Sequence, residues 1–120
     1  MLYTRHKTLT DNTEQTILTI PTGHVAHVKY VFVANHGQST NQVDLFWETG
    51  GVPDVYIFDG TSIGAGSKEI LGDSGSGVVF VLSEGETVKA QASSASGSIE
   101  VVLTIDLLPQ PSVFVNFNGA

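Results

Sequence analysis

Hydrophobic and polar side chains alternate along much of this chain with a period of two residues. The clearest stretch is Ile99–Leu107, whose odd-numbered positions are all apolar and whose even-numbered positions include Glu100 and Asp106. Successive side chains of a β-strand point to opposite faces of a sheet, so this pattern predicts a strand with one buried and one wet face. The same reasoning predicts further strands at Gln15–Ile20, Val25–Ala34, Gln42–Glu48, Val55–Asp59 and Thr87–Ala92.

Two segments are apolar on more than one face. Val25–Ala34 begins half-wet and becomes apolar on both faces, so either a second sheet or another subunit covers its second face. Val78–Leu82 is apolar at every position, which is typical of a strand covered on both sides. If Val25–Ala34 alternates strictly, one of its faces carries Ala26, Val28, Tyr30, Phe32 and Ala34.

Glycine, serine and proline punctuate these segments, for example at Thr22–Gly23 and Asp59–Gly60, where we expect tight turns. No window shows the 3.6-residue period of a helix. The chain is therefore predicted to be all-β, a single β-sandwich of about seven to nine short strands. A jelly roll is the preferred topology, and an immunoglobulin-like sandwich is the second choice.

The two ends of the chain differ from its middle. We expect an N-terminal arm at 1–12, the sandwich domain at 13–108 and a C-terminal extension at 109–120. The arm is locally basic, and the extension is uncharged and follows strand-breaking prolines. The extension either folds back as an edge strand of its own domain or crosses onto a neighbouring subunit. The expected assembly contacts are Leu2, Tyr3, Arg5, Lys7, Pro109, Pro111, Val113, Phe114, Val115 and Phe117.

Composition removes several classes of partner. The formal net charge is -7, and the five basic residues form no run, which argues against nucleic acid. No stretch approaches the roughly 20 apolar residues of a membrane helix, and the N-terminus has no signal-sequence pattern, so we expect a soluble protein. There is no cysteine and hence no disulfide.

No set of residues predicts catalysis, a metal or a cofactor. Gly72–Gly77 is similar to the active-site serine segment of trypsin-like proteases, but no histidine and aspartate partners can be placed for Ser74. His24 and His27 are three apart, so on a strand they point to opposite faces. Acidic residues beside loops, which lack the spacing of a calcium-binding EF-hand, are Asp54, Asp59 and Asp73. We therefore expect a protein that is not an enzyme.

Aromatic residues keep one binding hypothesis open. Trp47 shares its face with Val43 and Leu45, so we expect it in the core. Tyr56 and Phe58 share the face opposite to that of Val55 and Ile57, and the hypothesis requires an exposed patch that includes Tyr56 or Phe58. An exposed pair of rings would suit a carbohydrate-binding module, because sugar rings stack on aromatic side chains.

The order of turns and strands resembles small structural proteins of tailed bacteriophages. The resemblance covers about Thr13 to Leu107 and is carried by the strand and Pro-x-Gly turn at Ile17–Gly23, the Leu-x-x-Gly-Glu-x-Val turn at Leu82–Val88, and the Ala-Ser-rich segment Ala90–Ser94. It implies a non-enzymatic subunit that is used in many copies in a virion assembled in the host cytoplasm.

The leading expectation from this resemblance is a capsid decoration, or cement, protein. Such a protein binds the major capsid protein of the shell and its own sister subunits as a homo-oligomer, for example a trimer. The alternatives are a tail, neck or fibre component of the virion and, from a different class, the carbohydrate-binding module.

Overall fold

The computed structural model describes residues 1–9, 11–49, 54–72, 77–94 and 98–110. These residues form strands and turns, and none of them is helical. The strands of the described residues are β1 (Leu2–Leu9), β2 (Gln15–Thr19), β3 (His24–Asn35), β4 (Asn41–Glu48), β5 (Val55–Ile63), β6 (Lys68–Leu71), β7 (Phe80–Leu82), β8 (Thr87–Ala92) and β9 (Ile99–Pro109).

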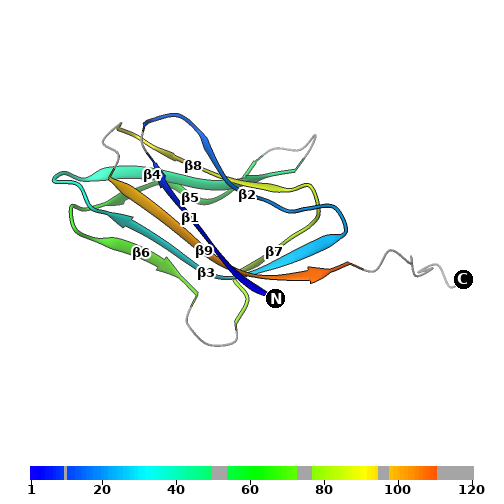
Figure 1. Cartoon of the computed structure of the whole chain (residues 1–120). Helices are drawn as coiled ribbons and strands as arrows, with labels where there is room; N and C mark the ends of the chain where they lie inside the picture. Colours follow the sequence, from blue (N-terminus) through cyan, green and yellow to red (C-terminus); the bar gives the residue numbers. More distant parts are fainter. Residues whose placement is uncertain (10, 50–53, 73–76, 95–97, 111–120) are drawn as a thin grey trace, which may run out of the picture.

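Two antiparallel sheets pack face to face (Figure 1). One sheet has the order β1-β9-β3-β6, with β7 also pairing to β3, and the other has the order β2-β8-β4-β5. The pairing is nested, since the first strand pairs with the last, β2 with β8, β3 with β6 and β7, and β4 with β5. This is the order of a jelly roll, in which one long hairpin folds over on itself. The predicted all-β sandwich is confirmed.

The core lies between the sheets. The inward residues of β9, namely Ile99, Val101, Leu103 and Ile105, are at most 1% exposed, which confirms the period-two pattern predicted for this strand. Burying each such side chain contributes about 1.5–3 kcal/mol relative to leaving it in water. Trp47 is partly buried and packs against the core, as its shared face with Val43 and Leu45 predicts.

The N-terminal segment is part of the sandwich. Leu2–Leu9 pairs with β9 along its whole length, from Leu2 opposite Asp106 to Leu9 opposite Ile99. The alternation is weak here, because positions on the inward side include Arg5 and Lys7, so the sequence pattern did not predict a strand. Most of the expected arm is therefore an edge strand of the sheet. The short strand β6 was also not predicted.

A β-bulge in β3 changes which residues face the core. The register against β9 moves from Val28 opposite Ile105 to Tyr30 opposite Thr104, so Lys29 is an extra residue. A bulge reverses the alternation beyond it. Val31 and Val33 are therefore buried on the same face as Val28. Tyr30 and Phe32, which were predicted to share the face of Val28, lie on the outer face and are only partly buried. The expected common face of Val25–Ala34 is wrong for this reason.

The prediction that Val78–Leu82 is covered on both sides is also wrong. Within the described residues only Phe80–Leu82 forms a strand here, and it pairs solely with β3 at the edge of the sheet. Leu82 is buried, but Val81 is 50% and Val78 is 44% exposed. β7 pairs with Ala26–Val28 and β6 with Val31–Ala34, so two short strands share this side of β3.

Two bulges in β5 overturn two further predictions. Val43 pairs with Thr61 and Leu45 with Phe58, so Asp59–Gly60 is a bulge inside β5 and not a turn between strands. Gly60 takes the positive φ of 62° that this geometry requires. Phe46 then pairs with Tyr56, which leaves Ile57 as the second extra residue. Phe58 consequently lies in the core at 7% exposure, while Tyr56 faces outward at 46%.

Gly72 is a position where a side chain would collide with the β3 backbone. It has a φ of +83°, and an added Cβ would lie 2.5 Å from the carbonyl oxygen of Lys29, at the bulge. Gly66 has a similar φ of +73°, but an added Cβ there meets no atom within 4 Å. We expect Gly66→Ala to cost about 1–2 kcal/mol from the positive φ alone. Gly72→Ala should cost about 1–3 kcal/mol more, since the backbone must move.

Urea unfolding of both variants measures this difference, and Gly66→Ala serves as the control for the φ penalty. Equal losses of unfolding free energy in the two variants would show that the contact between residue 72 and the β3 bulge is not tight.

Candidate functional site

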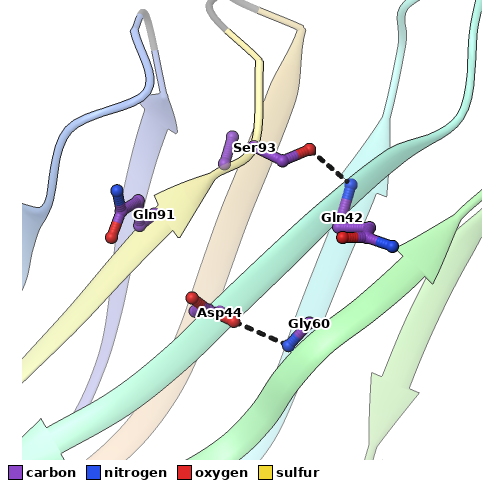
Figure 2. Close-up of a pocket in the computed structure, with 6 residues that line it drawn as sticks. Gln42, Asp44, Gly60, Gln91 and Ser93 are labelled. Carbon is purple, nitrogen blue, oxygen red and sulfur yellow. Dashed lines mark hydrogen bonds between the residues drawn. The ribbon is translucent and has the colours of Figure 1, made fainter.

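A polar pocket lies on the outer face of the β2-β8-β4-β5 sheet (Figure 2). Its volume is about 220 Å³. The pocket is formed where the bulge in β5 meets the ends of β4 and β8. Its lining residues are Gln42, Asp44, Gly60, Gln91, Ala92 and Ser93.

The β5 bulge holds the carboxylate of the pocket in place. The backbone N–H of Gly60 donates a hydrogen bond to Oδ1 of Asp44 at 2.6 Å (Figure 2). A hydrogen bond to a charged acceptor is stronger than one between neutral groups. Among the described residues, Oδ2 of Asp44 has no such partner, so one acceptor of the carboxylate remains available.

Ser93 is fixed by a buried asparagine. Its hydroxyl donates to Oδ1 of Asn41 at 2.7 Å and accepts a hydrogen bond from the backbone N–H of Gln42 at 3.1 Å. Asn41 is 3% exposed, and its Oδ1 also accepts hydrogen bonds from the backbone N–H groups of Ser93 and Ser94, which compensate for the burial of this oxygen. In the described part of the chain, the side-chain amide of Gln42 makes no hydrogen bond, and both its donor and its acceptor are available at the pocket.

Gln91 occupies the β8 side of the pocket, opposite Asp44 in the register between β4 and β8. Its Nε2 donates to the backbone carbonyl of Asn12 at 2.8 Å. The side chain is thereby held in one orientation, and its Oε1 remains an acceptor.

An aromatic ring lies beside the pocket on the same face. The ring of Tyr56 stacks on that of Phe46, with centroids 5.0 Å apart and planes 30° apart. Burial raises the pKa of Tyr56, and the nearby carboxylates of Asp44, Asp54, Asp59 and Glu14 add to this effect. The phenol therefore stays neutral and keeps its proton to donate.

Lys89 lies in the same row as Phe46 and Tyr56, but its charge is neutralised by carboxylates. Its Nζ is 2.7 Å from Oε1 of Glu48 and 3.8 Å from Oε1 of Glu14. The hydrogen bond to Glu48 raises the pKa of Lys89, with burial opposing it. Carboxylates therefore dominate this face.

The outer face of the other sheet is the second notable surface. The strand registers align His6, Val102, Phe32 and Ile70 in one row across β1, β9, β3 and β6. Ile70 is 40% exposed, and Val81 on the same face is 50% exposed. No described element covers this face, which we call the open face.

Two histidines meet on one carboxylate at one end of the open face. Nε2 of His6 and Nε2 of His36 each lie 2.8 Å from a different oxygen of Glu100. A carboxylate only accepts hydrogen bonds, so both rings donate. The bond from His36, which has the largest effect, and the bond from His6 lower the pKa of Glu100 below its usual value of 4.5.

The expected assembly residues divide between β1 and the C-terminal end. Leu2, Tyr3, Arg5 and Lys7 all lie on β1. Tyr3 and Arg5 line a groove of about 290 Å³ between β1 and β2, together with Leu18, Thr19, Pro21, Ile105 and Leu107. Pro109 ends β9 opposite His24. Outside the described residues lie Pro111, Val113, Phe114, Val115 and Phe117.

The other candidate residues do not converge. His24 contacts the carbonyl oxygen of Thr22 at 3.2 Å through Nδ1, whereas His27 pairs with Asp106 and Val81 on the open face. Ser74 and Asp73 lie outside the described residues. Within the described ranges, no group of three or more histidine, aspartate or glutamate side chains is arranged to hold a metal ion.

Comparison with known proteins finds no family model and no curated protein that matches this chain. The described residues include no helix long and apolar enough to span a membrane.

The pocket residues Gln42, Gln91 and Ser93 were not anticipated from the sequence. Gln42 and Asp44 are two apart on a predicted strand, which places them on one polar face. Gln91 on β8 and Ser93 just after β8 come much later in the chain, and the sequence pattern does not specify which strands pair. The pairing of β4 with β8 places Gln91 and Ser93 next to Gln42 and Asp44.

The histidine bonds to Glu100 make stability depend on pH. A carboxyl whose pKa is lowered by folding contributes stability that is complete above the unfolded value near 4.5 and is lost as pH falls through the folded value. We expect Glu100→Gln to lower the thermal midpoint at pH 7. The difference from the wild type should shrink as the pH falls below about 4.5.

Thermal unfolding at a series of pH values between 7 and 3 measures this effect. Glu69→Gln, a change at an exposed carboxylate on β6, is the control for the loss of one surface charge and should leave the thermal midpoint close to that of the wild type throughout the series. A Glu100→Gln difference that stays constant across the series would contradict the role of the carboxylate.

Proposed function

We propose that this protein is a non-enzymatic structural subunit of a tailed-bacteriophage virion, a capsid decoration protein that binds the shell and its sister subunits. The proposal begins from the resemblance of Thr13 to Leu107 to small phage structural proteins. Jelly rolls occur in viral capsid proteins and also in lectins, so the fold agrees with this role without selecting it.

The observation that carries the proposal is the open face. Its central row places Val102, Phe32 and Ile70 side by side on three adjacent strands, with Val81 on the same face. Polar and charged residues border this row, including Glu100 on β9 and Lys68 on β6. An apolar centre with a polar rim is typical of protein interfaces.

We assign the open face to the contact between sister subunits. A decoration protein is used in many copies, and each weak contact is strengthened by the number of contacts made at once. Apolar side chains exposed on a flat sheet are covered when a second copy packs against them. The basic residues of β1, Arg5 and Lys7, lie at the edge of the same sheet, where they are available to an acidic shell surface.

Two substitutions test the open face. We expect Ile70→Glu together with Val81→Glu to weaken self-association at least tenfold, because two carboxylates would be buried in the contact. Both side chains are half exposed in the single chain, so the fold should tolerate the change. Analytical ultracentrifugation over a concentration series measures the association.

Val55→Glu is the matched control, since Val55 is 43% exposed but lies on β5 of the other sheet. It should associate as the wild type does. A wild-type chain that remains monomeric at high concentration and fails to bind purified particles would overturn the proposal.

The C-terminal extension provides a separate test. Removal of residues 111–120 leaves every strand pair of the described structure in place, including the hydrogen bond from Gln110 N–H to the carbonyl of Gly23. We expect the shortened chain to keep its thermal midpoint and to bind particles more weakly. Co-sedimentation with particles lacking the protein measures binding. If the shortened chain unfolds, the extension is instead needed for the core.

Imaging of the native particle distinguishes decoration from the tail, neck or fibre alternative. Copies at trimeric or pseudo-sixfold positions of the shell support decoration. Copies confined to a ring or spike of the tail would replace it with the alternative.

A further inference from the structure

We propose that the pocket lined by Gln42, Asp44 and Gln91 binds a neutral sugar. This site lies on the sheet opposite the open face, so it is independent of the contacts between subunits. A particle subunit with this arrangement would have one face for assembly and one face for a glycan.

The dimensions of the pocket suit one small ring. Its volume of about 220 Å³ is below the roughly 300–1,000 Å³ of sites for drug-sized ligands. The glycine in the bulge contributes to this space, because Gly60 presents no side chain and an added Cβ would meet no atom within 4 Å. The pocket lies at the surface of the sheet and is not enclosed, as a site for one unit of a longer glycan requires.

The available polar groups match hydroxyl groups. Oδ2 of Asp44 and Oε1 of Gln91 are acceptors, and the amide of Gln42 supplies both a donor and an acceptor. A sugar hydroxyl donates and accepts at once, so it can satisfy each of these groups. The bonds from Gly60 to Asp44 and from Gln91 to Asn12 fix two of the three side chains beforehand. Such preorganisation reduces the entropy lost on binding.

The charges around the pocket select against anions and metal ions. Asp44 lines the pocket, and Asp59 directly precedes the lining residue Gly60 in β5, so negative charge is concentrated here. A phosphate or an acidic sugar would be repelled. Calcium takes six to eight oxygen ligands, whereas Asp44 is the only carboxylate that lines the pocket among the described residues.

Tyr56 supplies the apolar part of the recognition. Its ring is 46% exposed and rests on Phe46, which is itself only 1% exposed. Phe46 is two residues from Asp44 on β4, so the ring stack and the pocket lie on the same face. The C–H side of a sugar ring can cover Tyr56 while its hydroxyl groups enter the pocket.

An array of neutral and acidic glycans identifies the sugar, and an NMR titration of ¹⁵N-labelled full-length protein with glucose, galactose or N-acetylglucosamine locates it. We expect saturable shifts of the backbone amides of residues 42–44, 60 and 91–93. Glucuronate, an anionic control, should bind at least tenfold more weakly.

Matched variants test the named groups. Gln42→Ala and Asp44→Asn should each weaken binding about tenfold, the effect of losing one good hydrogen bond. Tyr56→Ala should weaken it more than Tyr56→Phe does, because only the first removes the ring. Gln38→Ala removes an exposed amide from the loop after β3 and should bind as the wild type does, with unchanged thermal midpoints throughout as the measure of intact folding.

Retention on an insoluble neutral polysaccharide shows whether the protein binds a sugar unit within a polysaccharide or only a free sugar. Either form of neutral-sugar binding supports the proposal. No neutral glycan bound on the array, or binding that Gln42→Ala and Asp44→Asn leave unchanged, would overturn it. Both results are separable from the open-face test, since Ile70→Glu and Val81→Glu lie on the other sheet.

Discussion

The ladder between β3 and β9 is the interaction on which the rest of the sandwich depends. It extends from His24 opposite Pro109 to Asn35 opposite Ile99, and it pairs strands from opposite ends of the chain. The strands β1, β6 and β7 attach only to these two strands. The inward side chains of the ladder are almost completely buried, so it provides one wall of the core while satisfying its own backbone polar groups. This pairing joins β1, β6 and β7 in one sheet of the jelly roll.

The sequence predicted the buried faces correctly where a strand is regular and incorrectly where a strand contains a bulge. Ile99–Leu107 and Thr87–Ala92 alternate without interruption, and their buried faces were predicted correctly. The bulges at Lys29 and at Ile57 each reverse the alternation. Val31 therefore shares a face with Val28, and Phe58 does not share a face with Tyr56, both contrary to the predictions. A bulge is set by the register between partners, and one sequence does not contain that register explicitly. The polar pocket was missed for the same reason, since Gln42 and Ser93 are 51 positions apart.

The outer faces of the two sheets differ because no core packing constrains them. One face carries an apolar row centred on Phe32, with Glu100 held by two histidines at one end. The other carries carboxylates, amides and the exposed ring of Tyr56. The sequence drew attention to the two ends of the chain, whereas the folded domain adds two broad surfaces of different chemistry. Fold stability and surface chemistry can therefore vary separately in this protein.

The two short strands beside β3 leave little continuous sheet edge on that side of the molecule. A long, flat sheet edge offers unpaired backbone groups to any other strand and promotes uncontrolled growth. Here the side of β3 away from β9 pairs with four residues of β6 and three residues of β7, at different positions along β3. On the opposite sheet, β5 is an edge strand interrupted by bulges. These two edges therefore offer few continuous backbone groups for pairing with a strand of another copy.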